Sequence, residues 1–413
     1  MTADEGSPTD ECHARIGLSR LVEPDDRAAV ELVAAAGPGA LWAAALRGTA
    51  AVERLVEASA VRRPPRLLRR IAAEPPSTAE VERDVTSAVA LGARVVCPGD
   101  PDWPTPLDLL EPARPLCLWV RGAIELELAT VRAVAVVGSR AATSYGTYVA
   151  GELGYGLAQQ GWTVVSGGAY GIDGAAHRGA LAADGLTIAV LACGIDIAYP
   201  RGHATLLERI AEQGVLVTEW PPGSSPYPHR FLSRNRLIAG LTTGTVVVEA
   251  AARSGARSTA NCAAELGRQL MAVPGPVTSA MSVGCHEMLR EGATCVRSAA
   301  DVIEALAPMG EHLTEPQRGP DEPRDHLPPA QRRTLEAVPV HRARPAVGIS
   351  REAGIPLDEV RRALGTLEVT GFVERHEGGY RLSAAERARR RRARRGRSSG
   401  GPSNGPGGEP PGG

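Results

Sequence analysis

Short apolar runs alternate with longer stretches of helical character through the middle of this 413-residue chain, and this alternation limits the possible folds more than any other feature. Runs that are apolar at nearly every position suit strands buried on both faces, as in a parallel sheet covered by helices. We therefore predict an α/β fold over residues 131–306, with an extended Rossmann-like, doubly wound and mostly parallel sheet. The runs are AVAVV (from Ala133), TVVS, TIAVLA, GVLVTE, TVVVEA, LMAVPG and ATCVR.

The segments before this region have a different character. Residues 1–90 carry apolar positions at helical spacing, for example in RAAVELVAAAGPGALWAAAL, and predict an N-terminal helical domain of SAM or helix-hairpin-helix type. Residues 91–130 contain the β-rich runs VVCPG and PLCLWVRG around a proline-dense stretch. They predict an extended lead-in to the sheet.

Three segments follow the predicted sheet. Residues 307–327 are charged and proline-rich and are interpreted as a linker. Residues 328–383 give a helix, a short helix, an amphipathic helix and a hairpin, which is the order of a winged helix with its wing tip at residues 376–379. Residues 384–413 carry eight arginines against two glutamates and then a Gly/Pro/Ser stretch, and are predicted to be a disordered tail.

The composition excludes several classes of protein. No stretch reaches the roughly 18 apolar residues that cross a bilayer, and the acidic start lacks the basic segment of a secretory signal, so we expect a cytoplasmic protein without membrane contact. The seven cysteines form no CxxC pair, which argues against a zinc ribbon or a disulfide framework and favours buried or idle thiols. All 46 basic residues are arginine, whose planar fork suits phosphate.

The turn after the first apolar run contains a candidate phosphate site. In an open parallel sheet, ligands bind at the carboxyl ends of the strands. Gly138 permits a tight turn there, and Ser139 and Arg140 offer backbone amides and a guanidinium near the next helix. The sequence GSRAAT lacks the second and third glycines of the GxGxxG fingerprint, so no dinucleotide cofactor is expected. The alternative is an ordinary turn with a solvated arginine.

The turn after the second run contains Ser166, Gly167 and Gly168, where the glycines allow close approach of a ligand backbone. Asp173 at the following helix is interpreted as a cap in preference to a catalyst. His177, one helical turn further on, is interpreted as a packed, hydrogen-bonded histidine and not as a general base.

The segment PYPHRFLSRNRLIAGL is the most distinctive in the chain. It places Arg230, Arg234 and Arg236 around Phe231, one of only two phenylalanines, with His229 just before them. Arginines that meet phosphates and a ring that stacks on a base suit a nucleic-acid strand. The alternatives are that Phe231 anchors a helix to the core and that the arginines pair with acidic residues.

The turn after TVVVEA follows Glu249 and includes Ser254, Gly255, Ser258 and Thr259, which can supply hydroxyl and amide donors beside the other turns. A carboxylate at a strand end can be catalytic or can hold a neighbouring arginine. The sequence leaves both roles of Glu249 open.

Six motifs in order resemble the DNA-processing protein A family (DprA, also called Smf): VGSR, SGGAYGID-x2-AH, TIAVLACGIDIAYP, FLSRNRLIAGL, VVVEAAARSGA and MAVPGPVTSAMSVGCHEMLREGA. The resemblance covers about residues 95–305. It implies a non-catalytic single-stranded DNA-binding protein that protects incoming DNA in natural transformation and loads the recombinase RecA onto it.

The resemblance also implies roles for particular residues. Arg140 corresponds to the backbone-contacting arginine of the family's GSR motif, Ser166 and Gly167 to residues of the same pocket, and Phe231 to a base-contacting phenylalanine. Residues 234–236 (Arg234, Asn235, Arg236) match an RNR motif, although FLSRNR replaces the usual FPxRNR. The segment with Cys285, His286, Met288 and Leu289 resembles a self-association surface and implies a homodimer.

Two other functions stay open. Related Rossmann-like domains hydrolyse nucleotide N-glycosidic bonds beside a PGGxGT loop, but LTTGT at this place lacks the paired glycines before Gly244. The other alternative is a regulator that senses a nucleotide and reads duplex DNA through the winged helix. Arg361 and Arg362 are available for phosphates there, whereas the negative charges of Asp358 and Glu359 oppose a phosphate contact.

Overall fold

The computed structural model describes residues 10–24, 26–59, 61, 66–307 and 323–398, with side chains up to residue 391. The chain separates into two compact units, Met1–Thr314 and Glu315–Gly413. Each unit is described by itself. Most of the predicted linker, 308–322, lies outside the described residues.

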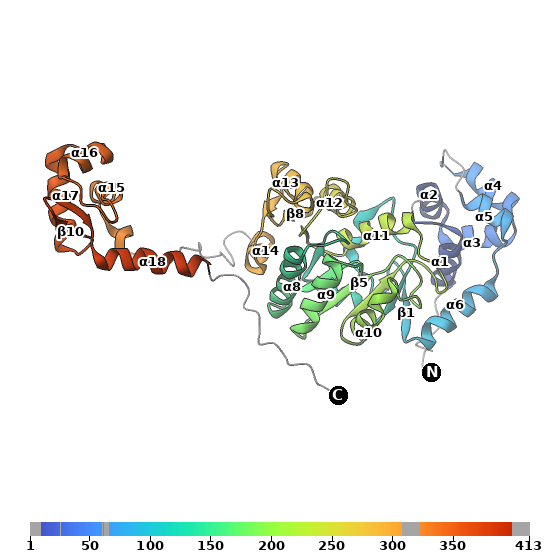
Figure 1. The fold of residues 1–413 in the computed structure, drawn as a ribbon. Helices are drawn as coiled ribbons and strands as arrows, with labels where there is room; N and C mark the ends of the chain where they lie inside the picture. The colour runs from blue at the N-terminus through green and yellow to red at the C-terminus, as the bar shows by residue number, and fades with distance from the viewer. Residues whose placement is uncertain (1–9, 25, 60, 62–65, 308–322, 399–413) are drawn as a thin grey trace, which may run out of the picture. The chain divides into compact units, whose positions relative to one another are not determined.

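A sheet flanked by helices forms the centre of the first unit (Figure 1). It has nine strands in the order β1-β2-β6-β5-β4-β3-β7-β8-β9. All pairs from β6 to β9 are parallel, whereas β1 and β2 run antiparallel at one edge, which confirms the predicted mostly parallel α/β sheet. The predicted lead-in therefore supplies two strands of the sheet itself. The strands are Ala93–Val96 (β1), Leu118–Arg121 (β2), Ala133–Val137 (β3), Thr163–Ser166 (β4), Thr187–Val190 (β5), Val215–Thr218 (β6), Gly244–Val247 (β7), Gln269–Ala272 (β8) and Thr294–Cys295 (β9).

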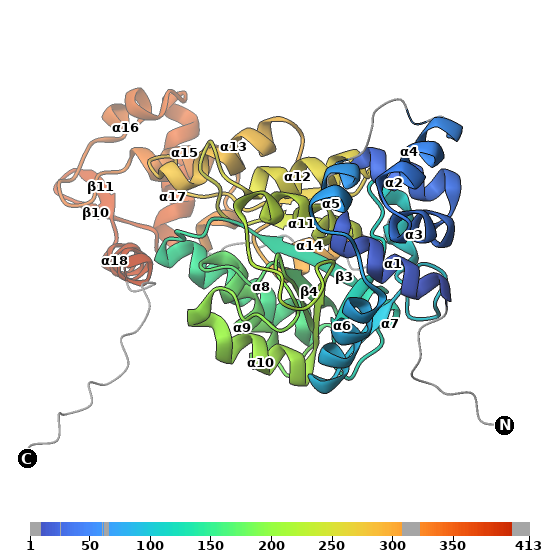
Figure 2. The ribbon, with the colours of Figure 1, turned by 90° about the vertical axis from the view of Figure 1, so that its right-hand side faces the viewer.

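Alternate residues of β3 enter two different hydrophobic clusters, which explains why the run is apolar throughout. Ala133, Ala135 and Val137 join one cluster, and Val134 and Val136 join the other. Helices α8 and α9 lie on one side of the sheet and α11 and α12 on the other (Figures 1 and 2). The helices after β2 are Leu126–Thr130 (α7), Ser144–Gln159 (α8), Ile172–Ala182 (α9), Ala204–Gln213 (α10), Pro228–Gly240 (α11), Ala256–Glu265 (α12), Val283–Arg290 (α13) and Ala299–Leu306 (α14).

The N-terminal region is helical, as predicted, but it shares one hydrophobic cluster with the sheet. Leu18 and Leu41 from the helices belong to the same cluster as Trp119 of β2 and Leu216 of β6. The predicted boundary at residue 90 therefore does not divide compact units. The helices are Asp10–Leu21 (α1), Arg27–Ala36 (α2), Pro38–Leu46 (α3), Thr49–Ala58 (α4), Leu67–Ala73 (α5) and Thr78–Ala90 (α6).

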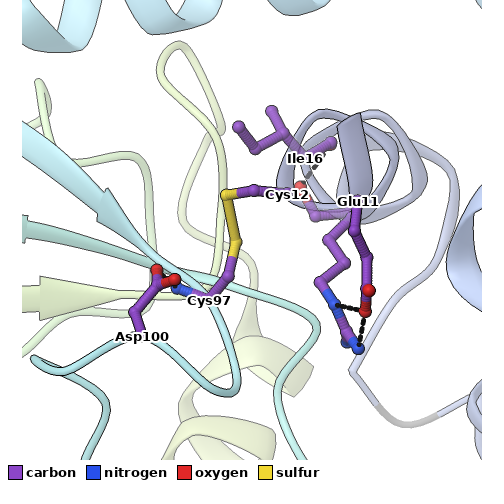
Figure 3. The surroundings of a disulfide bond; sticks show 7 residues. Glu11, Cys12, Ile16, Cys97 and Asp100 are labelled. Atoms are coloured by element: carbon purple, nitrogen blue, oxygen red, sulfur yellow. Dashed lines mark hydrogen bonds and ion pairs between the residues drawn. A yellow bond between two sulfur atoms is a disulfide. The ribbon is translucent and has the colours of Figure 1, made fainter. Parts of the chain in front are cut away.

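A disulfide joins Cys12 of α1 to Cys97 just after β1 (Figure 3), and the Cys97 N–H donates to Asp100 at 2.7 Å. The prediction of idle thiols is therefore wrong for these two cysteines. Their pairing depends on two segments 85 residues apart, which no local spacing reveals. Burial raises the pKa of the Cys117 and Cys193 thiols to about 12, so the prediction holds for these two.

Among the described residues, no single helix is long and apolar enough to cross a bilayer. The pair α2 and α3 has sufficient length and apolar character when the two are taken together, but the chain bends by 109° between them.

The second unit has the predicted order of elements. Helices Pro329–Ala337 (α15), Ala346–Ala353 (α16) and Leu357–Val369 (α17) precede the hairpin Val373–His376 (β10) and Gly379–Leu382 (β11). Glu377 and Gly378 form the hairpin turn with φ of 46° and 78°, as a two-residue turn of this kind requires.

The first half of the tail that was predicted to be disordered forms a helix, α18 (Ala384–Ser398). Ser383 caps it, since its Oγ accepts the Glu386 N–H at 3.1 Å. The buried Glu386 pairs with Arg390, and Arg387 binds the Leu382 carbonyl, so this prediction is corrected for 384–398. Residues 399–413 lie outside the described part of the chain.

Candidate nucleic-acid interface

A cavity of about 630 Å³ opens where the strand order of the sheet reverses, at the carboxyl ends of β3 and β7. Ligands of doubly wound sheets bind at this point because the loops on its two sides diverge. Residues of the first, third and fourth predicted turns contribute to the cavity wall, and the second contributes through Ala169 and Asp173, just after residues 166–168. The lining includes Val137, Gly138, Ser139, Arg140, Ala141, Ala169, Asp173, Tyr199, Pro226, Pro228, Phe231, Leu232, Arg234, Asn235, Ile238, Ala251, Arg253, Ser254, Gly255, Ala256 and Thr259.

Hydrogen bonds within the chain hold the turn after β3, while the side chain of Arg140 in this turn is exposed. The Ser139 N–H donates to the Glu249 carbonyl at 2.8 Å, and the Ala141 N–H donates to the Ser139 hydroxyl at 3.2 Å. A side chain at Gly138 would collide with Ile172, so glycine is needed there. The Ser139 amide is thus committed inside the turn, and the exposed Arg140 side chain is the group that can meet a phosphate.

Arg140 lies over Phe231, with its guanidinium carbon 4.5 Å from the ring centroid. The Tyr199 ring centroid lies 5.5 Å from that of the Phe231 ring, and the two rings are tilted by 51°. Phe231 is half-buried and belongs to none of the hydrophobic clusters, and Leu232 beside it is 56% exposed. Phe231 therefore faces the cavity and does not anchor α11 to the core.

Residues 166–168 support the cavity from beneath and do not line it. The Ser166 hydroxyl donates to the Val136 carbonyl at 2.7 Å, and the Gly167 N–H donates to Asp173 at 3.2 Å. Gly168 has a φ of 66°, which favours glycine. These three residues are buried and lie outside the cavity lining, so their predicted contact with a ligand stays a prediction.

Arg230 is 8% exposed and is enclosed by partners from the N-terminal region and its own segment. Its Nη2 donates to Glu23 at 2.6 Å, and its guanidinium lies 5.4 Å from the Trp220 ring and 5.2 Å from the Tyr227 ring. Burial acts to raise the pKa of the Glu23 carboxyl, but the hydrogen bonds from Arg230 and Trp220 outweigh it and the pKa is lowered. Arg230 therefore ties α11 to the N-terminal helices.

Arg234 and Arg236 also have partners inside the chain. Arg234 is 3% exposed and donates to the carbonyls of Gly167 and Val190, and burial lowers its pKa to about 10. Arg236 forms a two-point ion pair with the buried Glu219, at 2.5 Å for both contacts.

Asn235, 7% exposed, donates to the Gly255 carbonyl at 3.4 Å. Arg230 and Arg236 pair with acidic residues and do not line the cavity, so the prediction of phosphate contacts is corrected for these two. Arg234 is held by backbone carbonyls, yet it lines the cavity together with Asn235, and their contacts with DNA stay a prediction.

The acidic and imidazole groups near the cavity are also occupied. Glu249 is 1% exposed and accepts the Thr143 N–H at 2.9 Å and the Thr143 hydroxyl at 2.6 Å, so it holds the start of α8; it forms no ion pair with any arginine in the described part of the chain. Burial raises the pKa of Asp173, although Arg234 opposes the shift. His177 is buried beside the Thr187 hydroxyl at 2.7 Å, and burial lowers its pKa to about 3.

The charge left on the cavity wall is positive. Arg140 and Arg253 are exposed and form no ion pair with any described residue, whereas Asp173, the acidic residue of the lining, is buried near Arg234. Neither Tyr199 nor Arg253 is among the residues predicted from the sequence. Tyr199 belongs to the loop after β5, and the rule that sites lie at strand ends would have identified it.

The predicted self-association residues divide into two groups. Cys285 and Met288 are buried in a hydrophobic cluster of the chain, so they are unable to form a contact surface, and this part of the prediction is corrected. His286, which bonds the Gly275 carbonyl at 3.0 Å, and Leu289 are half-buried.

Comparison with known proteins decides the family. The model of the family DNA recombination-mediator protein A matches residues 94–307. A putative DNA processing protein DprA of Mycobacterium tuberculosis is 46% identical over 319 residues, which cover 74% of this chain and 82% of that protein. This chain belongs to the DNA recombination-mediator protein A family.

Other members of the family agree with this assignment. Protein Smf of Escherichia coli is 38% identical over 303 residues, 71% of this chain and 79% of that protein. The X-ray structure of DNA processing protein A from Streptococcus pneumoniae superposes with a TM-score of 0.58 at 29% identity, and covers 73% of this chain and 99% of that one. The predicted resemblance is confirmed, and with it a role in DNA binding and recombination.

Proposed function

We propose that this chain binds single-stranded DNA in the cavity between β3 and β7, protects it, and loads RecA onto it during DNA uptake and recombination. The observation that carries the proposal is the unpaired Arg140 guanidinium lying over the cavity-facing ring of Phe231. A cation for the phosphate and a ring for the base stand side by side. Family membership supports the role in recombination.

Binding exchanges the contact between Arg140 and Phe231 for two contacts with the strand. A cation over an exposed ring contributes about 0.5–1 kcal/mol, whereas a base stacked on an aromatic side chain contributes about 1–3 kcal/mol. Once Arg140 leaves the ring, its fork is free to bind a phosphate through two hydrogen bonds. The exchange therefore favours the bound state.

The geometry favours single strands over duplexes. Phe231 is half-buried inside the cavity, so a base must enter the cavity to stack on it. The faces of bases within a duplex are covered by their neighbours, and exposing one costs a few kcal/mol. An unpaired strand presents its bases without that cost.

Arg230, Arg234 and Arg236 contribute by positioning α11. Each guanidinium holds the helix to a different part of the first unit, namely Glu23, the Gly167 carbonyl and Glu219. The helix in turn presents Phe231 to the cavity. Phosphate contacts are assigned to Arg140 and to Arg253, which lies exposed on the β7 side of the cavity.

The site binds and does not catalyse, because its potential acids and bases are committed elsewhere. Glu249 holds Thr143, and His177 is neutral and buried near pH 7. We expect no release of free base from AMP, which separates this function from nucleotide N-glycosidic hydrolysis.

A homodimer is proposed through the exposed part of the segment near α13. Val277 is 88% exposed and Val283 is 37% exposed, and His286 of α13 bonds the Gly275 carbonyl just before Val277. Exposed apolar side chains of this kind are candidates for a contact with a second copy. Val283→Asp should shift the protein from dimer to monomer in light scattering, and an unchanged mass would refute this surface.

The second unit is proposed to act as a winged helix with α18 as an extension. Arg389 lies 5.9 Å from the Phe372 ring, and Arg387 contacts Glu374, so α18 begins on the hairpin's own surface. Truncation after Ser383 with a salt titration of DNA binding would measure what its arginines add.

The central test is direct binding of oligo-dT to the full chain without magnesium or nucleotide. We expect binding whose affinity falls steeply as salt rises, and weaker binding of a duplex of the same length. Salt-insensitive binding, or equal affinity for the duplex, would count against the proposal. RecA loading would then be measured as the formation of RecA filaments on oligo-dT coated with single-strand-binding protein. Filaments should form faster in the presence of this chain than in its absence.

A further inference from the structure

Tyr199 is the tyrosine of the cavity lining, where its ring contacts the ring of Phe231. It is 39% exposed, and its hydroxyl forms no hydrogen bond with any described residue. Two other tyrosines are engaged outside the cavity lining: Tyr145 donates to the Pro274 carbonyl at 2.6 Å, and Tyr227 stacks on His229. An exposed, amphipathic ring whose hydroxyl is not engaged is available to a ligand.

We propose that Tyr199 is a second base-stacking side chain, so that the cavity holds two successive bases of one strand, one on Phe231 and one on Tyr199. The inference rests on the proposed binding of single-stranded DNA and deepens it. The ligand class is a single-stranded nucleic acid of at least two nucleotides.

The tilt between the two rings supports this assignment. Their centroids are 5.5 Å apart and their planes differ by 51°, so the rings touch each other and their faces point in different directions. Two neighbouring bases that stack on these faces are not parallel, as they are in a regular stack. An unpaired strand can adopt this arrangement, whereas a duplex must first unstack its bases.

Arg140 and the two rings line the same cavity. The Arg140 guanidinium carbon lies 4.5 Å from the Phe231 ring centroid, and the Tyr199 ring centroid lies 5.5 Å from that of Phe231, so both groups contact the same ring. A strand whose phosphate follows Arg140 places one base on Phe231 and the next on Tyr199. Because every base has a face that stacks, this arrangement tolerates all sequences.

The test uses dT oligonucleotides with 2-aminopurine at single positions, whose fluorescence is quenched on stacking, together with affinity measurements on the full chain. Tyr199→Ala should weaken binding about 5- to 150-fold, the range for loss of one stacked base. Tyr199→Phe should retain affinity. Tyr199→Leu keeps an apolar side chain of similar bulk but no ring, so it should lose affinity as Tyr199→Ala does.

Tyr155→Ala is the matched control, since Tyr155 is 40% exposed on α8 but does not line the cavity. In the wild type, two adjacent 2-aminopurine positions should be quenched, and Tyr199→Ala should release one of them. Full affinity in Tyr199→Leu, or unchanged quenching in Tyr199→Ala, would overturn the inference.

The outcome for Phe231→Ala separates the two proposals. If this variant loses affinity while Tyr199→Ala behaves as the wild type, the cavity binds one base and only the second platform fails. If the wild type itself does not bind oligo-dT, the proposed function fails together with this inference.

Discussion

Replacing Arg140 by alanine should change the salt dependence of DNA binding while leaving the fold intact. The side chain is exposed, forms no ion pair with a described residue, and lies over the Phe231 ring. The turn around it is held by backbone contacts, such as the Ser139 N–H to the Glu249 carbonyl at 2.8 Å. The thermal midpoint of the variant should therefore match that of the wild type.

The magnitude follows from the release of counterions by one phosphate contact. On a single strand, each neutralised phosphate contributes about 0.7 to the slope of log affinity against log salt. Between 50 and 200 mM salt, a fourfold change, a difference of about 0.7 in slope corresponds to a factor of about 2.6. The affinity advantage of the wild type over Arg140→Ala should shrink by that factor.

The assay is fluorescence anisotropy of labelled oligo-dT at several salt concentrations, without magnesium. Arg209→Ala serves as the control, because Arg209 is exposed on α10 and does not line the cavity. Phe231→Ala should lower the affinity at every salt concentration without changing the slope, since stacking releases no counterions. Parallel lines for Arg140→Ala and the wild type would refute the phosphate contact.

Three further predictions concern stability and reactivity. Cys97→Ser should lower the free energy of unfolding by about 2–5 kcal/mol, because the disulfide from Cys12 closes a loop of 85 residues. Urea titration of the oxidised protein measures this difference, and equal midpoints for the variant and the wild type would contradict it. Glu23→Gln should cost about 1–3 kcal/mol at pH 7 by weakening the contact with the buried Arg230. Because the pKa of Glu23 is lowered from its ordinary 4.5, its contribution is present above pH 4.5 and disappears as the pH falls through the folded-state value. Wild type and Glu23→Gln should therefore converge in acid urea titrations, and a constant gap would contradict this assignment. Among the free thiols, Cys295 is the exposed one, so a maleimide should label it first in the native protein. Rapid labelling of Cys117, Cys193 or Cys285, which are buried, would contradict this prediction.

The sequence predicted the sheet well because its information is local and repeated. Each run buried on both faces must be apolar throughout, and each connection must be long enough for a helix that returns to the same edge. The four turns at the carboxyl ends meet in the cavity for the same reason, since parallel strands bring these ends together. Arg140 and Phe231 lie at the cavity wall where the sequence placed them.

The sequence by itself thus determined the α/β class, the edge of the sheet that carries the site, and the family. It did not show which arginines are engaged with other parts of the folded chain and which are available to a ligand. Burying a guanidinium requires partners that satisfy its charge and donors, and those of Arg230 and Arg236 are Glu23 and Glu219 on other elements. The bond from Cys12 to Cys97 likewise depends on distant segments. Only the tertiary structure brings such groups together, and so it alone decided that Arg140 remains available to a ligand.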